Sequence, residues 1–363
     1  MNKQFKKNLL ELKRYRTSTG RDIEGGLCLD RNERVSKFAK KIMDEALDSI
    51  TSSVLSCYPD PGELYKALSS FLSVSQNCIY LTNGITEGIR VAFETLTSPG
   101  DEVIIVEPTY PMYRVYSDIY QTKFIPIKFT QELHLEYEKI ESMITKKTAF
   151  VCIPNPNLPI ESYLSLKIIK DIAKKCQKHD VMFFVDEAYA FLGGESAISL
   201  IDDFENLVVF QTMSKAFGLA GVRLGWMVSN QKNIDYFSKT RALVESNGVT
   251  LVVAKYMIEN IDILKEYVSD LKQGLTYLRR ELTTLGIKSF GGDYTNSTLL
   301  FMDNEDDANS ALEYLRERKI YVRASFKEPF NNCLRITLGP RDSMKKFLKY
   351  FNEWLQNNRM ETE

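Results

Sequence analysis

The segment Gln211–Trp226 contains a lysine whose surroundings favour nucleophilic chemistry. Lys215 follows the apolar run 207–210, which is typical of a buried strand, and three glycines after it allow another group to approach closely. Burial beside other cations lowers the pKa of a lysine, so that its amine can attack a carbonyl. The hydroxyl of Ser214 and the guanidinium of Arg223 are suited to bind a phosphate. A solvated loop lysine is the alternative, and the rest of the chain disfavours it.

Further polar residues follow other apolar runs, and these runs predict the sheet that must position them. We expect strands at 102–106, 122–127, 148–153, 181–185 and 207–211. Continuously apolar strands that alternate with helices predict a parallel sheet covered on both faces. Ligands of such sheets bind beyond the carboxyl ends of the strands. The residues at these ends are Tyr110, Asn157, Asp186, Tyr189 and Lys215.

These side chains together suit pyridoxal phosphate as a cofactor. Its aldehyde needs Lys215, and its pyridine nitrogen stays protonated beside an anion such as Asp186. Tyr110 can stack on the ring, and Asn157 and Tyr189 can donate to the ring oxygen. The phosphate-binding groups would be the helix N-terminus at Gly84, Ile85 and Thr86, together with Ser214 and Arg223.

Several motifs give the chain a family resemblance. The most specific is SKAFGLAG at 214–221 with RLG at 223–225; the others are LDRNE at 29–33, YPDP at 58–61, NG at 83–84, PTYPMY at 108–113, VDEAY at 185–189 and LRIT at 334–337. With these motifs the chain resembles class I/II aminotransferases of fold type I, which depend on pyridoxal phosphate, and is most similar to the histidinol-phosphate aminotransferase group. The resemblance spans roughly residues 10–340 and assigns the cofactor-binding residues the roles given above.

The resemblance also implies roles in substrate binding and assembly. Tyr58 would reach the cofactor phosphate of a neighbouring subunit, which implies a homodimer with shared active sites. Arg335 would bind the α-carboxylate of the amino donor. Arg323 matches the position that holds a substrate phosphate, and Tyr15 matches a tyrosine that closes over the same end.

The loop N-P-N-L-P-I-E departs from the family pattern N-P-N-x-P-T-G, because Ile160 and Glu161 replace Thr-Gly. Asn157 aligns with the cofactor-binding asparagine if that asparagine precedes x. If the next position has this role, Leu158 has lost it. Both alignments are open at this point.

Two further departures concern the substrate pocket. The sequence ALVESNGV at 242–249 replaces a Pro-Tyr-Asn run, so that Glu245 and Asn247 would line a different pocket. Thr86 stands where the family usually has an acid. The cofactor interpretation is unaffected by these changes, whereas the substrate is left open.

The resemblance implies a particular fold. We expect an α/β protein with a mostly parallel, seven-stranded sheet, helices on both faces and a smaller α+β C-terminal domain. We predict an N-terminal arm at 1–30 that joins the C-terminal domain, a large cofactor-binding domain at 31–250 and a small domain at 251–363.

Composition excludes several other classes of protein. The net charge of −1 argues against a nucleic-acid partner. The chain lacks a signal-peptide core and any run of about 18 apolar residues, so we expect a cytoplasmic protein without a membrane partner. The cysteines form no C-x-x-C pair, and the only histidines are His134 and His179, so no metal site is expected.

The expected activity is transfer of an amino group between glutamate and a small, phosphorylated ketone or aldehyde, of the histidinol-phosphate type or another amino-alcohol phosphate, in amino-acid metabolism. A decarboxylase of phospho-amino acids with the same fold is an alternative, because the sequence does not show which substrate bond is broken. A cofactor-sensing regulator is a third possibility, disfavoured because the chain has no basic excess for DNA binding.

Overall fold

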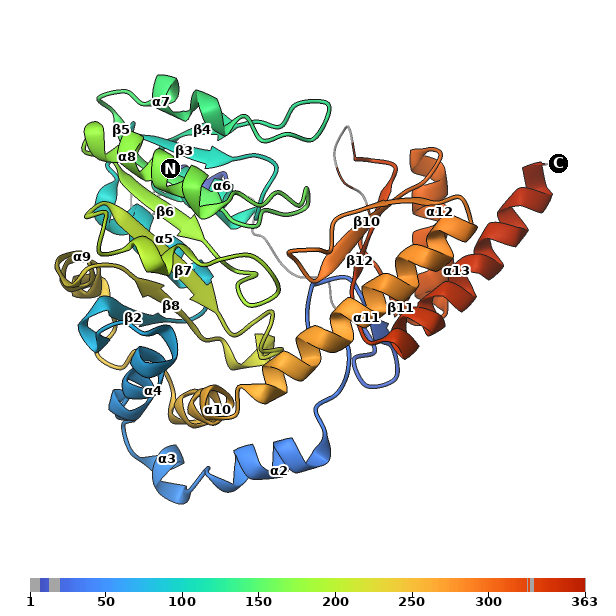
Figure 1. The fold of residues 1–363 in the computed structure, drawn as a ribbon, viewed down its shortest axis with the longest axis horizontal. Coiled ribbons are helices and arrows are strands. Elements are labelled where there is room, and N and C mark those ends of the chain that lie inside the picture. Colours follow the sequence, from blue (N-terminus) through green and yellow to red (C-terminus); the bar gives the residue numbers. More distant parts are fainter. Residues whose placement is uncertain (1–6, 13–19, 325, 327–329, 363) are drawn as a thin grey trace.

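The structure, a computed structural model, describes residues 7–12, 20–324, 326 and 330–362. Its largest feature is a sheet of seven strands, here called the large sheet, in the order β2-β8-β7-β6-β5-β3-β4 (Figure 1). The strands are β2 (Ile79–Thr82), β3 (Glu102–Val106), β4 (Lys123–Ile127), β5 (Thr148–Pro154), β6 (Met182–Asp186), β7 (Leu207–Thr212) and β8 (Gly225–Val228). Only β8 runs antiparallel to its neighbours, which confirms the predicted mostly parallel sheet.

Helices cover both faces of the large sheet because successive residues of its strands point to opposite faces. Phe183 packs in the core on one face and Phe184 in the core on the other. Around the sheet lie α4 (Gly62–Leu72), α5 (Ile85–Leu96), α6 (Met112–Ile119), α7 (Ile140–Met143), α8 (Leu166–Lys178) and α9 (Gln231–Phe237). Short 3₁₀ turns span Gln76–Cys78, Tyr137–Lys139, Ala197–Leu200, Ala220–Val222 and Ser238–Thr240.

The second lobe contains an antiparallel sheet, here called the C-terminal sheet, in the order β12-β10-β9. Its strands are β9 (Lys288–Phe290), β10 (Ser297–Phe301) and β12 (Cys333–Thr337). The helices after the large sheet are α10 (Gly248–Glu259), which packs against α4, and then α11 (Asp262–Thr284), α12 (Glu305–Glu317) and α13 (Arg341–Thr362). α11 runs from beside α10 into this lobe and lies along α13 (Figure 1). The domain boundary near residue 250 stays a prediction.

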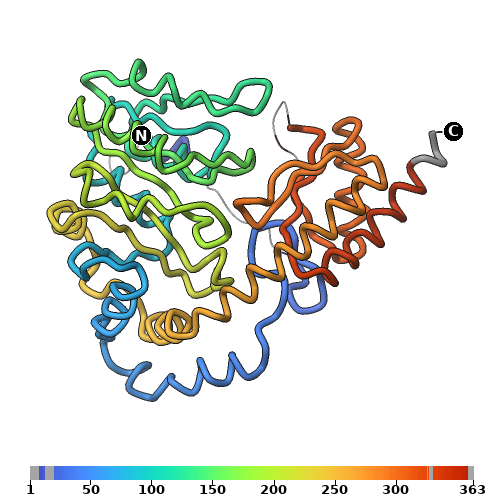
Figure 2. The backbone as a smooth tube through the Cα atoms, in the orientation of Figure 1, coloured from blue at the N-terminus to red at the C-terminus, as the bar shows by residue number. Residues whose placement is uncertain are grey.

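The N-terminal part of the chain contacts both lobes. In α1 (Lys7–Leu10), Asn8 donates to the carbonyl of Ile119 in α6, so this helix contacts the lobe of the large sheet, and the arm at 1–30 stays a prediction. By contrast, β1 (Leu27–Cys28) pairs in parallel with β11 (Ile320–Tyr321). The chain then continues through α2 (Lys40–Asp48) and α3 (Ser52–Ser56) along the lower edge of the molecule (Figure 2). None of the described helices combines the length and the apolar character needed to cross a membrane.

Candidate active site

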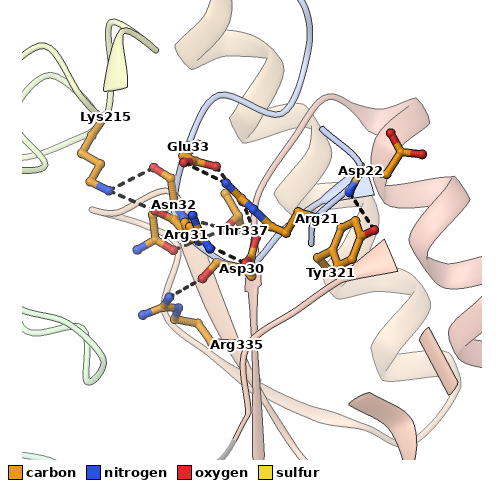
Figure 3. A network of polar contacts seen from close by, with 10 residues as sticks. All are labelled: Arg21, Asp22, Asp30, Arg31, Asn32, Glu33, Lys215, Tyr321, Arg335 and Thr337. Carbon is orange, nitrogen blue, oxygen red and sulfur yellow. Dashed lines mark hydrogen bonds and ion pairs between the residues drawn. The ribbon is translucent and has the colours of Figure 1, made fainter. Parts of the chain in front are cut away.

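Lys215 points from the loop after β7 toward the N-terminal segment (Figure 3). Its Nζ donates to the carbonyl oxygens of Arg31 (3.2 Å) and Asn32 (3.3 Å), and it lies 5.8 Å from the centre of the Tyr189 ring. Arg335, on β12, lies close by, on the other side of this segment (Figure 3). The lysine therefore stands where the large sheet, the N-terminal segment and the C-terminal sheet meet.

The pKa of Lys215 is lowered to about 8, chiefly by burial and then by the positive charge of Arg335. Glu33 acts in the opposite direction, and the charge of Arg223 adds to the lowering. Because a lysine ordinarily has a pKa near 10.4, this environment makes a much larger fraction of the amine neutral at physiological pH. The neutral amine is the nucleophile.

We therefore expect a pH dependence in the reaction of the apoprotein with pyridoxal phosphate. The lowered pKa predicts that the rate of covalent incorporation rises with pH and is half-maximal near pH 8. Because the folded protein binds fewer protons than the unfolded chain between about pH 8 and 10.5, this group also makes the apoprotein more stable as pH rises through that window. Stopped-flow absorbance measures the incorporation rate. Arg335→Gln should move the midpoint upward, and a midpoint of 10 or more in the wild type would contradict the assignment.

A cradle for an anionic group lies at the N-terminus of α5, beside β8. Gly84 adopts φ +69°, and a Cβ on it would come within 2.8 Å of Nη2 of Arg223. A Cβ on Gly225 would approach the Ile85 nitrogen to 2.9 Å. Arg223 Nη1 donates to Ser214 Oγ at 3.4 Å. The first N–H groups of a helix have no acceptor within it, so with the guanidinium and hydroxyl they fit a phosphate.

Asp186 ends β6 as a buried carboxylate. Tyr113 donates to its Oδ2 at 2.6 Å, and the Ala188 N–H donates to its Oδ1 at 3.0 Å. Burial raises the pKa of Asp186 to about 6, although both hydrogen bonds favour the charged form. A protonated pyridine nitrogen would supply the positive charge that this carboxylate needs, so Asp186 fits the ring-nitrogen partner.

The residues expected around the cofactor ring differ in how they are placed. The Tyr189 hydroxyl accepts from Asn32 Nδ2 at 2.7 Å, and burial raises the pKa of Tyr189 to about 12, so it stays protonated and can donate. Tyr110 is 46% exposed and its hydroxyl lies 3.1 Å from Thr86 Oγ1, which leaves its ring open for stacking.

Asn157 is fully buried, and both of its amide hydrogens are engaged. Nδ2 donates to the carbonyls of Pro108 and Ile160 at 3.1 Å each. Oδ1 is buried and has no partner among the described atoms. Asn157 thus holds its own loop together, and its contact with a ring oxygen stays a prediction.

Two arginines lie opposite each other on the C-terminal side of the site. Arg323 and Arg335 form an antiparallel bridge, with N–H to carbonyl distances of 3.1 and 2.7 Å. Arg335 Nη2 donates to the Asp30 carbonyl, while its buried Nε has no partner in the described part of the chain. Arg323 is exposed and makes no ion pair with a described residue. Burial, and the nearby charge of Arg323, lower the pKa of Arg335.

Two predicted residues do not join this cluster. The side chain of Tyr58 is 90% exposed, in the loop between α3 and α4. Tyr15 lies outside the described residues.

Two residues that organise the site were not predicted from the sequence. Asn32 adopts φ +56°, accepts from Lys215 through its carbonyl, donates to Tyr189 through its side chain and donates its N–H to Thr337 Oγ1. Tyr113 contacts Asp186. Both lie inside motifs of the family resemblance, LDRNE and PTYPMY, and this position in a motif was the available signal.

A separate cavity of about 940 Å³ is lined by residues of both lobes, including Leu133, Tyr163, Arg279 and Phe290. Neither Lys215 nor Asp186 lines it, so this cavity is distinct from the candidate active site.

Comparisons with known proteins identify the family of this chain. The family described as aminotransferase class I and II matches residues 25–351. The histidinol-phosphate aminotransferase of Christiangramia forsetii is 30% identical over 358 residues, covering 97% of each chain. That of Thermoanaerobacter sp. (strain X514) is 30% identical over 336 residues, covering 91% of this chain and 93% of the relative. The crystal structure of histidinol-phosphate aminotransferase from Sinorhizobium meliloti, in complex with pyridoxal-5'-phosphate, superposes with a TM-score of 0.87 at 20% identity and covers 98% of both chains. The protein therefore belongs to the class I and II aminotransferase family.

Proposed function

We propose that this protein is a pyridoxal-phosphate-dependent aminotransferase that exchanges an amino group between glutamate and a phosphorylated carbonyl compound of the histidinol-phosphate type. Family membership supports the reaction class, and the names of the relatives support the substrate class. The cofactor, when bound, would supply an electron sink that lets bonds at the substrate's α-carbon break.

Each residue of the site would have a separate role in this reaction. Lys215 would hold the cofactor covalently and move a proton at the substrate carbon, which its lowered pKa suits. Asp186 would keep the ring nitrogen charged. Tyr189 would donate to the ring oxygen, and Arg223 with the α5 N-terminus would hold the cofactor phosphate.

The observation that carries the substrate proposal is the Arg323–Arg335 pair. Like charges directly opposite each other on adjacent strands are unfavourable, and a ligand with two anionic ends would offset this cost. The partly unpaired guanidinium of Arg335 lies nearer to Lys215 and suits a carboxylate, while the exposed Arg323 suits the more distant phosphate.

A half-reaction screen tests this function. Purified enzyme is mixed with glutamate, histidinol phosphate or histidinol, and the cofactor absorbance is followed. We expect conversion with glutamate and histidinol phosphate, and a rate at least about tenfold lower with histidinol, which lacks the phosphate. Release of carbon dioxide from a phospho-amino acid, with no need for a keto acid, would instead identify a decarboxylase.

Substitution of the two arginines should separate the two half-reactions. Arg335→Ala should impair the reaction with glutamate. Arg323→Ala should spare glutamate and raise KM for the phosphorylated partner, because a lost charge-assisted pair removes about 1.5–3 kcal/mol. Stopped-flow half-reactions measure both effects. Equal effects of Arg323→Ala on both substrates, or none on either, would remove the argument for a phosphorylated substrate.

We also infer a homodimer in which Tyr58 reaches the partner's cofactor phosphate. Tyr58 is 90% exposed, and Leu55 and Leu243 nearby are 70% and 100% exposed. The loops that carry Pro59 and Leu243 line one cavity of about 230 Å³, so these residues form one surface. Exposed apolar groups gathered in this way are typical of an interface.

Mixed dimers test this arrangement. Neither Lys215→Ala nor Tyr58→Ala should be fully active alone, but a heterodimer should contain one intact site, formed by Lys215 of one subunit and Tyr58 of the other. Mixing the two variants after mild dissociation should therefore give intact sites that contribute up to about a quarter of the wild-type activity, as statistical re-pairing predicts. If no activity returns although heterodimers form, Tyr58 does not act across the interface.

A further inference from the structure

The two residues that depart from the family pattern, Ile160 and Glu161, both contact the second lobe. The Glu161 carboxylate accepts four hydrogen bonds from a segment more than 130 positions away. Oε2 accepts from the N–H of Gly292 (2.9 Å), the N–H of Tyr294 (3.2 Å) and Thr295 Oγ1 (2.6 Å), and Oε1 accepts from the N–H of Asp293 (3.1 Å); these are the residues 292–295 just before β10.

The receiving segment is shaped for this carboxylate. Gly291 and Gly292 adopt φ values of +85° and +107°, which side chains other than hydrogen disfavour. This conformation turns the successive N–H groups of 292–294 toward the carboxylate, an arrangement that binds anions. A Cβ on Gly291 would lie 3.1 Å from the Cβ of Glu161, so the two loops are already in close approach.

Apolar contacts strengthen the same junction. Ile160 is 1% exposed and packs in a cluster with Leu299 of β10 and Cys333 of β12. The ring of Tyr163 stacks on that of Tyr294, with centroids 4.3 Å apart and planes 13° from parallel. Polar and apolar contacts thus join one loop of the large sheet to the C-terminal sheet.

The junction is connected to both halves of the active site by short paths. On one side, the Asn157 N–H donates to the Ser162 carbonyl at 3.0 Å, and the Asn155 N–H donates to the carbonyl of Asp186 at 2.8 Å. On the other side, Leu299 is the direct register partner of Arg335. Movement at this junction would therefore change the position of Arg335 relative to Asp186 and Lys215.

We propose that Ile160 and Glu161, with residues 292–295, form a contact between the lobes, here called the latch. The latch holds the C-terminal sheet, and with it Arg335, in a fixed position relative to the cofactor site. Glu161 is then a positioning residue for the carboxylate of the substrate, an inference that rests on the proposed function. Because the contacts of the latch are made between groups of the protein itself, they would hold the cleft in place before the substrate binds, and less ordering would be required on binding.

The test uses the full-length holoenzyme with Glu161→Gln, which removes the charge and retains the size. Amide hydrogen exchange should become at least about tenfold faster at residues 292–294, since one of the two oxygens that accept from these N–H groups becomes an NH2 that cannot accept, and the other loses its charge. KM for glutamate should rise roughly tenfold with kcat changed less than about twofold, because Arg335 would contact the carboxylate equally in ground and transition states. The cofactor absorbance should stay the same.

Matched variants make the outcome specific. Glu195→Gln, an exposed carboxylate on the neighbouring loop, removes the same charge and should change neither measurement. Thr295→Val removes only the hydroxyl that donates to Glu161 Oε2. Because both substitutions act on the same contact, the effect of the double variant on KM should differ from the sum of the two single effects. Unchanged exchange at 292–294 in Glu161→Gln would overturn the latch. The latch would also be overturned if Glu161→Gln and Thr295→Val both lost bound cofactor and showed a lower kcat.

One measurement separates this inference from the proposed function. Binding of 2-oxoglutarate to the holoenzyme can be followed by calorimetry without turnover. If the wild type transfers no amino group, but binds 2-oxoglutarate with an affinity that falls in Glu161→Gln, the latch stands and the proposed function is wrong.

Discussion

Lys215→Ala is expected to abolish covalent attachment of pyridoxal phosphate and to lower turnover by roughly 10⁴-fold or more, because the proposed function makes this residue both the nucleophile and the proton-transfer group. The lysine is placed for this role by its half-buried position, its contacts with the carbonyls of Arg31 and Asn32, and a pKa lowered to about 8. Alanine removes the amine and leaves the backbone of the loop free to keep its fold.

The attachment can be measured directly. Borohydride reduction of the wild type should place the cofactor on the peptide that contains Lys215, and the visible absorbance should be absent from the variant. Lys232→Ala, an exposed lysine of α9, is the control and should be as active as the wild type. Undiminished turnover in Lys215→Ala would end the aminotransferase proposal.

Asp186→Asn should leave the fold intact and raise the barrier of the reaction by on the order of 3 kcal/mol or more. The carboxylate is buried, and burial raises its pKa to about 6. A positively charged ring nitrogen beside it would therefore stabilise its ionised form. An amide of the same size can still accept from Tyr113, but it carries no charge to hold the nitrogen protonated.

Single-turnover rates with glutamate measure this effect, and circular dichroism checks the fold. Asp235→Asn, an exposed carboxylate on α9, should show no loss. A rate for Asp186→Asn close to that of the wild type would show that another acid lies beside the ring nitrogen.

The elements predicted from the sequence were those with a strong local pattern. β3, β5, β6 and β7 are buried almost throughout, so each reads as a continuous apolar run with a polar residue at its end. β2 and β8 were missed because they have only four residues each. β8 begins at Gly225, whose lack of a side chain lets it lie against the turn at Gly84, and this reason is visible only in the packed structure.

The sequence by itself determined the local elements that carry the candidate site: a lysine, an aspartate and a helix start after a glycine, each at the end of a strand or turn that its own neighbours in the chain specify. Only the tertiary structure decided how the lobes meet. Asn32 joins Lys215, Tyr189 and Thr337, and Glu161 binds residues 292–295, across separations of more than 100 positions. Such contacts leave no periodic signal in one sequence, because their partners are chosen by the packing of distant segments and not by local backbone preference.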